Sequence, residues 1–344
     1  MTIKDIANIC GCSVSSVSRV LNNRPDVSDE VRRRVLATVE KYGFVPNTTA
    51  RDLVKIKSDA VGLVVRGLQN PFFTDIIQAI ESELDRAGYT MVMRQIRSRD
   101  DEIKVGAMME REKRLRGIVF LGGRSDYSRA ELSLLNVPFV CCTYTNTSKT
   151  LTGSEYSSVS IEDEQTAYEA VCELVSQGHK KIALLNANDD CSSVSLLRYK
   201  GYRRALEENG IEFNPELVAG TDDSFFIKDA YDTMQKLLEK TDDFTALFAI
   251  SDGMAIGAMK ALREHGKSIP EDCSVIAIDG IDVSEYIQPT LTTMCQPKIE
   301  MGRRSVEILI DMIENCADNR QITLPAVLRK GASVCPPKKR LSRP

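Results

Sequence analysis

The stretch Thr2–Asn22, TIKDIANICGCSVSSVSRVLN, has the pattern of two short helices joined by a tight turn. Thr2 can cap the first helix while Asp5 reaches back to it, and apolar residues follow at helical spacing. Gly11 lets the backbone turn, and Ser13 offers an N-cap to the second helix. Because each helix carries one apolar face, the two are expected to pack together as a helix-turn-helix.

The outer face of the second helix in such a motif stays free of the core. Here that face presents residues that are small, polar or cationic, as a base-reading surface should be: Val14, Ser15, Ser18 and Arg19.

A third helix is expected to begin at Ser28 and to end at Gly43, with acidic residues in its first turn where they complement the helix dipole. Its apolar residues, which should cover the core of the three-helix unit, are Val31, Val35, Val39 and Tyr42. Pro46 separates this unit from residues 50–54, a segment too short to stay helical alone in water. That segment should become ordered only on a partner.

Three motifs in this region, TIKDIA at 2–7, SVSSVSRVLN at 13–22 and Pro46-Asn47 followed by ARDL at 50–53, resemble the headpiece and hinge of the LacI/GalR family of bacterial repressors. The resemblance implies that Val14, Ser15 and Arg19 contact bases in the major groove and that Leu53 wedges into the minor groove. Arginine can pair with guanine, valine can touch a thymine methyl group, and an inserted leucine can unstack a base step. Taken alone, Arg19 could be surface charge and Leu53 core packing. The residues assigned to contacts with double-stranded operator DNA are Thr2, Ser13, Val14, Ser15, Ser16, Ser18, Arg19, Asn22, Asn47, Ala50, Arg51 and Leu53.

Length and charge agree with a DNA-binding unit attached to a larger body. The 344 residues suffice for two or three domains with substantial cores. The net charge is −4, yet residues 1–57 hold ten Lys and Arg against six Asp and Glu. A basic headpiece on an acidic body suits contact with a specific DNA site, because attraction to phosphate is local and screened by salt.

The sequence gives no sign of a membrane partner or of a cofactor. No stretch resembles a signal peptide, and no apolar run approaches the roughly 20 residues that span a bilayer, so a cytoplasmic protein is expected. The ten cysteines include no CxxC pair and no Cys/His cluster with zinc-like spacing, which predicts reduced thiols and no metal. Cys191, in a polar loop, is the candidate for thiol reactivity.

The body of the chain alternates strands and helices, which predicts parallel sheets covered on both faces. A polar stretch at 143–158 divides this alternation into two similar halves, and a crossing is expected at 290–296 before the final helix. The expected parts are a headpiece at 1–45, a hinge at 46–58, a core at 59–335 and a basic tail at 336–344. The core halves are expected to comprise about 59–160 with 291–320, and 161–290 with 321–335.

The body resembles the periplasmic-binding-protein-like core of the same repressor family, so that the likeness runs from Met1 to about Val334. Its motifs are Asn70-Pro71-Phe72-Phe73, GHKKIA at 178–183, Arg198 with Gly201-Tyr202, Ser251-Asp252, Asp279 and PTLTT at 289–293. The expected fold is thus an all-α helix-turn-helix headpiece plus an α/β bilobal core of type I with two parallel-sheet subdomains.

Open α/β sheets bind ligands at the carboxyl ends of their strands, so two facing lobes imply a cleft. An arginine and an aspartate can hold a polyol while an aromatic ring covers the apolar face of a sugar. Asp252 more simply starts a helix, and Asp279 could instead cap a turn. The residues expected to bind an effector, a sugar or sugar derivative, are Phe72, Phe73, Arg198, Ser251 and Asp279. Arg66-Gly67 stands where the family often has Pro-Asp, which leaves the identity of the ligand open.

These patterns together predict a homodimeric transcriptional regulator, usually a repressor, whose operator binding is controlled by a small molecule. Whether the effector releases DNA or promotes its binding is left open. The alternative is a soluble sugar-binding protein without a regulatory role. An enzyme is not expected, because both histidines, His179 and His265, lie in turns that suit structural roles and no acid–base pair can be placed.

Overall fold

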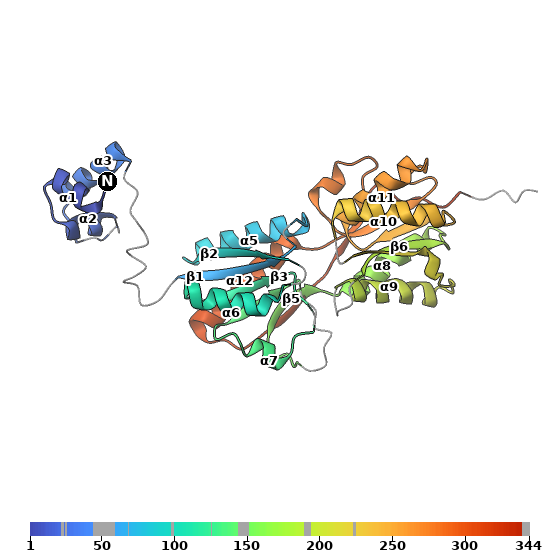
Figure 1. Ribbon diagram of the computed structural model, residues 1–344, viewed down its shortest axis with the longest axis horizontal. Coiled ribbons are helices and arrows are strands. Elements are labelled where there is room, and N and C mark those ends of the chain that lie inside the picture. The colour runs from blue at the N-terminus through green and yellow to red at the C-terminus, as the bar shows by residue number, and fades with distance from the viewer. Residues whose placement is uncertain are drawn as a thin grey trace, which may run out of the picture. The chain divides into compact units, whose positions relative to one another are not determined.

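The computed structural model describes residues 1–21, 24, 26–43, 59–67, 69–97, 100–124, 126–143, 151–188, 194–222 and 225–338. Contacts divide the chain into two units, Met1–Ser58 and Asp59–Pro344, and each is described by itself (Figure 1). No helix in the described ranges is both long enough and apolar enough to cross a membrane.

The first unit consists of α1 (Ile3–Cys10), α2 (Val14–Leu21) and α3 (Asp29–Tyr42). Both predicted N-caps are confirmed: Thr2 and Asp5 form a capping box, and the Ser16 amide donates to Ser13 Oγ at 3.0 Å. Gly11 ends α1 in the left-handed conformation with φ +59°, which a glycine adopts without strain.

The core of this unit is small. Its buried members are Ile6, Ala7, Cys10, Val17, Val20 and Val35. Val31 and Val39 are only half-buried against it, and the prediction that Tyr42 is buried is wrong, because its side chain is 45 % exposed in the last turn of α3.

The first sheet of the second unit has the strand order β11-β5-β4-β3-β1-β2, and all its pairs are parallel. Its strands are β1 (Ala60–Arg66), β2 (Thr90–Ile96), β3 (Gly117–Leu121), β4 (Phe139–Cys142), β5 (Ser157–Ile161) and β11 (Gln321–Leu324). The helices α5 (Phe72–Arg86) and α12 (Lys298–Asn315) cover one face, and α6 (Glu102–Lys113) covers the other. This sheet, its helices and the short α7 (Arg129–Leu132) form the first lobe.

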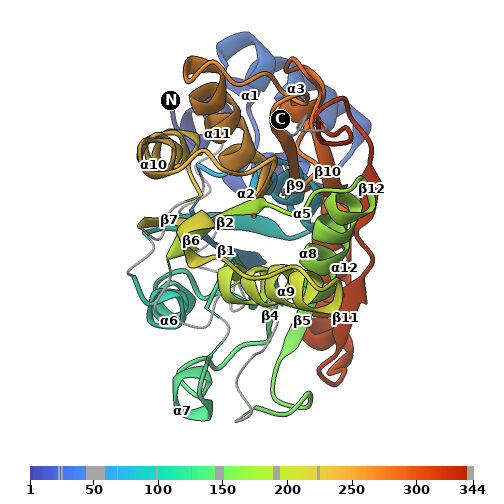
Figure 2. The same ribbon diagram turned by 90° about the vertical axis from the view of Figure 1, so that its right-hand side faces the viewer.

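The second sheet has the order β12-β10-β9-β8-β6-β7, parallel except for the β10–β12 pair. Its strands are β6 (Ile182–Asn188), β7 (Val218–Asp222), β8 (Ala246–Ala249), β9 (Ser274–Asp279), β10 (Thr292–Cys295) and β12 (Val327–Arg329). The pair α8 (Asp163–Ser176) and α9 (Val194–Glu208) covers one face, and the pair α10 (Ile227–Lys240) and α11 (Asp252–Glu264) covers the other (Figure 2). These elements form the second lobe.

The path of the chain between the lobes differs from the expected one at two strands. β10 lies in the second sheet and β11 in the first, so the chain crosses after Cys295 and again between β11 and β12. The expected assignment of 291–320 to one half is therefore wrong for 292–295, and the assignment of 321–335 to the other half is wrong for β11. Both strands are four residues long, too short for a periodic signal.

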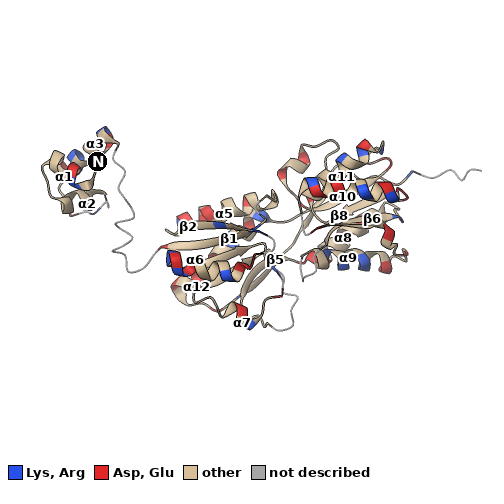
Figure 3. Ribbon diagram, in the orientation of Figure 1, with Lys and Arg blue, Asp and Glu red and all other residues tan. Residues whose placement is uncertain are grey.

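The polar stretch at 143–158 that was expected to divide the two halves runs into the buried strand β5, SSVSI, at its last two residues. Ser157 can be buried because its hydroxyl donates to Asn319 Oδ1 at 2.9 Å and accepts from the Arg320 amide at 3.1 Å. These hydrogen bonds offset the cost of removing a polar group from water. Charged side chains lie mainly on the helices of both lobes rather than on the sheets (Figure 3).

Candidate functional site

Three of the four residues on the predicted base-contacting face of α2 are exposed. Val17 and Val20 are buried, whereas Val14, Ser15 and Arg19 on the opposite side are exposed. The Arg19 guanidinium lies 3.5 Å from Asp26 Oδ2, but both side chains are 58 % exposed, so this ion pair holds the arginine only weakly.

The other predicted DNA contacts fall into two groups. Thr2 and Ser13 are exposed caps, and Ser16 and Ser18 are half-buried on α2. A second group lies outside the described residues: Asn22, Asn47, Ala50, Arg51 and Leu53. Cys191 lies outside them as well.

A cavity of about 150 Å³ lies between the two lobes at the carboxyl ends of their strands, where a cleft was expected. From the first lobe it is lined at the ends of β1, β3 and β4, and by the start of α5. From the second lobe it is lined by the starts of α8 and α9 and by the end of β9. Four of the five predicted effector residues line it: Phe72, Phe73, Arg198 and Asp279.

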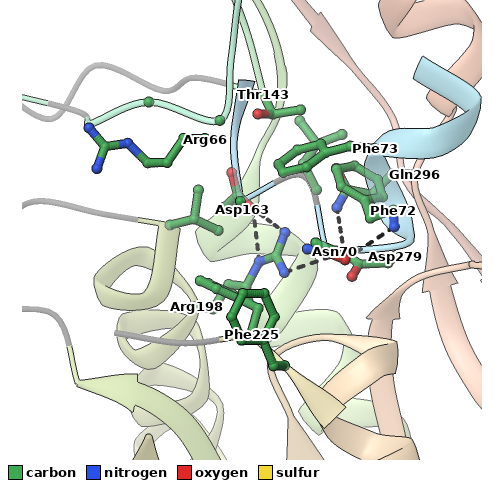
Figure 4. Close-up of a pocket in the computed structure, with 16 residues that line it drawn as sticks. Arg66, Asn70, Phe72, Phe73, Thr143, Asp163, Arg198, Phe225, Asp279 and Gln296 are labelled. Atoms are coloured by element: carbon green, nitrogen blue, oxygen red, sulfur yellow. Dashed lines mark hydrogen bonds and ion pairs between the residues drawn. The ribbon is translucent and has the colours of Figure 1, made fainter. Parts of the chain in front are cut away.

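Arg198 is the centre of the charged side of this pocket (Figure 4). Its Nε donates to Asp163 Oδ1 at 3.0 Å, Nη1 lies 3.6 Å from Asp279 Oδ1, and Nη1 also donates to the carbonyl oxygen of Ile250. Burial raises the pKa of Asp163, and the positive charge of Arg198 opposes that rise. The guanidinium is therefore held in one orientation by fixed acceptors.

Asp279 ends β9 with a φ of +133°, a backbone conformation that side-chain-bearing residues rarely adopt. Its Oδ1 accepts from Gln296 Nε2 at 2.9 Å, while its buried Oδ2 has no hydrogen-bond partner among the described residues. Burial raises the pKa of Asp279 to about 7, against the opposing effect of Arg198. A strained, buried acceptor without a partner is typical of a position that binds a ligand donor.

The opposite side of the pocket is aromatic. Phe72 and Phe73 are buried, with ring centroids 5.5 Å apart and planes tilted by 50°. Asn70 stabilises the turn that leads into α5, because its Oδ1 accepts a hydrogen bond from the Phe72 amide at 3.1 Å. Charged acceptors on one side and aromatic rings on the other suit the two faces of a sugar ring.

Ser251, the fifth residue expected to bind the effector, is not among the residues that line the pocket. It is buried and caps α11 by accepting from the Met254 amide at 3.3 Å. Asp252, which we expected to start a helix, accepts from the Ile281 amide at 2.9 Å and from the Thr293 hydroxyl. Residues 251 and 252 thus join α11 to its neighbours.

Sequence reasoning missed several residues of the pocket. Asp163 and Gln296 follow β5 and β10. We expected only the end of a polar stretch where β5 begins, and only a crossing between the halves where β10 lies. Had those strands been recognised, their carboxyl ends would have marked both residues as candidates. Arg66 lines the pocket from the end of β1, and Thr143 and Phe225 line it from loops.

His179 is buried in a structural position away from the pocket. Its Nδ1 pairs with Thr245 Oγ1 and its Nε2 with the carbonyl oxygen of Cys335, both at 2.9 Å. The ring thereby joins the α8–β6 turn to the segment that follows β12.

Comparison with known proteins gives matches over nearly the whole chain. Residues 2–47 match the lacI family of bacterial regulatory proteins, and residues 171–334 match a periplasmic-binding-protein-like domain. The HTH-type transcriptional regulator MalR of Clostridium butyricum is 37 % identical over 332 residues, which cover 95 % of this chain and 97 % of MalR.

Solved structures agree. The Lac repressor dimer bound to operator and the anti-inducer ONPF superposes with a TM-score of 0.77 at 26 % identity, covering 97 % of this chain and 99 % of that one. The transcriptional regulator CelR in complex with cellobiose gives a TM-score of 0.71 at 27 % identity, covering 97 % of this chain and all of that one.

Proposed function

We propose a function for each part of this protein from one premise: the chain belongs to the lacI family of bacterial regulatory proteins. It is a sequence-specific DNA-binding transcriptional regulator of the repressor type, it acts as a homodimer, and a small-molecule effector controls its operator binding. In our proposal residues 1–45 bind DNA, 46–58 form the hinge, and the core binds the effector in the cytoplasm without catalysing a reaction.

The exposed face of α2 is proposed to enter the major groove. The single observation that supports this is that Val14, Ser15 and Arg19 are exposed on the side of α2 that faces away from the buried Val17 and Val20. Thr2, Ser13, Ser16 and Ser18 are proposed to contact the same half-site. Asn22, Asn47, Ala50, Arg51 and Leu53 are proposed contacts by family resemblance. Two headpieces of a dimer would bind the halves of an inverted repeat.

Fluorescence anisotropy with an inverted-repeat promoter fragment and a scrambled competitor tests the DNA proposal. Arg19→Ala should weaken specific binding by about 5- to 150-fold, because a good arginine–base pair contributes about 1–3 kcal/mol of discrimination. Arg33→Ala, an exposed charge on α3, removes the same charge from another helix and should weaken specific and scrambled DNA alike. Equal loss of specificity in both variants would reject the role of Arg19.

The pocket between the lobes is proposed to bind the effector, a sugar or sugar derivative. The observation that carries this is the arrangement of Arg198 and the unpartnered Asp279 Oδ2 opposite Phe72 and Phe73. A soluble sugar-binding protein without a regulatory role would share this pocket, but it would not need the helix-turn-helix that precedes it.

A thermal-shift screen of sugars and sugar phosphates tests the effector proposal. A ligand that stabilises the wild type should lose its effect with Arg198→Ala and keep it with Arg203→Ala, an exposed arginine on the same helix. If Arg198→Ala retained the full shift, with its fold intact by circular dichroism, Arg198 would be excluded from the site.

A further inference from the structure

The guanidinium of Arg66, at the carboxyl end of β1, lines the pocket but is already neutralised by a buried partner. Its Nη2 donates to Glu102 Oε2 and, at 2.8 Å, to the carbonyl oxygen of Asp100. Glu102 is 2 % exposed, and its Oε1 accepts from the Tyr127 hydroxyl and, at 2.9 Å, from the Arg124 amide. Both oxygens of Glu102 therefore have partners, and its charge balances that of Arg66.

The residues around Glu102 fit this arrangement closely. Any Cβ at Gly123 would collide with the Tyr127 hydroxyl, so only glycine leaves room for it there. Burial raises the pKa of Tyr127 well above its usual value, which keeps the hydroxyl protonated and able to donate. The guanidinium carbon of Arg124 lies 5.5 Å from the centre of the Tyr127 ring and covers it.

The second guanidinium in the pocket, that of Arg198, is neutralised as well. Asp163 lies 2.9 Å from its Nη2, and Asp279 lies 3.6 Å from its Nη1. Among the described residues that line the pocket, the charged ones are these three and Arg66, with Glu102 directly behind. Two guanidinium groups thus face three carboxyl groups, and the pocket offers no cation that an anionic ligand could take without breaking an ion pair.

We propose that Glu102 sets the charge selectivity of this pocket, so that it takes an uncharged polyol and rejects the phosphorylated form of the same sugar. The inference rests on the proposed function, because it narrows the class of the effector. A phosphate would have to draw Arg66 or Arg198 away from a buried carboxylate, which would then remain charged without its partner. A neutral hydroxyl instead donates to the free Oδ2 of Asp279 and breaks nothing.

Isothermal titration calorimetry on the full-length protein tests the inference with matched pairs: ribose and ribose 5-phosphate, glucose and glucose 6-phosphate, maltose and maltose 6-phosphate. The wild type should bind a neutral sugar at least about tenfold more tightly than its phosphorylated partner. Glu102→Gln removes the charge while keeping the shape, so it should reduce this ratio at least about tenfold by freeing Arg66 for the phosphate. Tyr127→Phe is the matched control, because it removes a hydrogen bond to Glu102 without changing its charge, and should keep the ratio.

The outcomes separate this inference from the proposed function. A phosphorylated sugar that binds the wild type as tightly as its neutral partner overturns the charge selectivity and leaves a sugar effector in place. An unchanged ratio in folded Glu102→Gln overturns the role of Glu102. Binding of no member of any pair overturns both the inference and the sugar effector, while operator binding reports separately on the headpiece. If Glu102→Gln does not fold, Arg66→Gln serves instead. This variant removes the cation that a phosphate would bind, so the protein should still reject phosphorylated sugars. If Arg66→Gln binds a phosphorylated sugar as tightly as its neutral partner, the inference is overturned.

Discussion

Replacing Ile6 by alanine should unfold the headpiece without unfolding the core. Ile6 is 0 % exposed and is one of only six buried side chains in this described core, so its truncation leaves a cavity among the other five. An isoleucine-to-alanine change in a core costs about 2–5 kcal/mol. A unit of roughly 45 residues has a free energy of unfolding of about 2–7 kcal/mol, so the change removes most or all of it.

Limited proteolysis and operator anisotropy measure this effect. In Ile6→Ala the protease should remove the headpiece first and leave a resistant core, and operator affinity should fall by at least about tenfold. Ile9→Ala is the matched control, because Ile9 lies on the same helix and is 49 % exposed. If Ile6→Ala resisted protease and bound operator like Ile9→Ala, the assignment of this small core as the support of the DNA-contacting face would be refuted.

Three further predictions concern the core. Asp279→Asn should melt at a higher temperature than the wild type, and this difference should grow between pH 5 and 8. The reason is that the pKa of the Asp279 carboxyl is raised from 3.8 to about 7, so its contribution to stability is greatest below pH about 4 and is lost as the pH rises. A difference in melting temperature that does not grow with pH would contradict this. Burial lowers the pKa of His179, so its contribution is present above pH about 6.5 and is lost on acidification; His179→Asn should melt with less dependence on pH between 7 and 5. Gly201→Ala should disrupt the packing of α8 on α9, because its Cβ would collide with the carbonyl oxygen of Glu164, whereas Gly253→Ala, with 3.4 Å to its nearest neighbour, should melt within a few degrees of wild type.

The headpiece could be predicted from sequence in detail because its signals are local. The capping box of Thr2 and Asp5 and the cap at Ser13 depend on residues three positions apart, and these contacts form as soon as the helix does. The exposure of Tyr42 could not be predicted in this way, because it depends on whether the last turn of α3 faces another element.

The strands that sequence reasoning missed have their stabilising contacts far away in the chain. Ser157 in β5 is buried only because Asn319 and Arg320 supply hydrogen bonds from more than 160 positions later. A serine-rich segment without that information has the composition of a loop. The error carried over to the site, because Asp163 follows this strand, whereas Arg198 and Asp279 were identified as residues of family motifs.

If the pocket is the effector site, as we propose, its two sides have different roles in regulation. Asp163, Arg198 and Asp279 all belong to the second lobe and are already joined by ion pairs, so their geometry does not depend on the first lobe. A ligand held by this group alone would bind every arrangement of the lobes equally and shift none of them. In the proposed site, the differential free energy that regulation requires would therefore come from residues of the first lobe, Phe73 and Arg66 among them, which line the pocket from the other side.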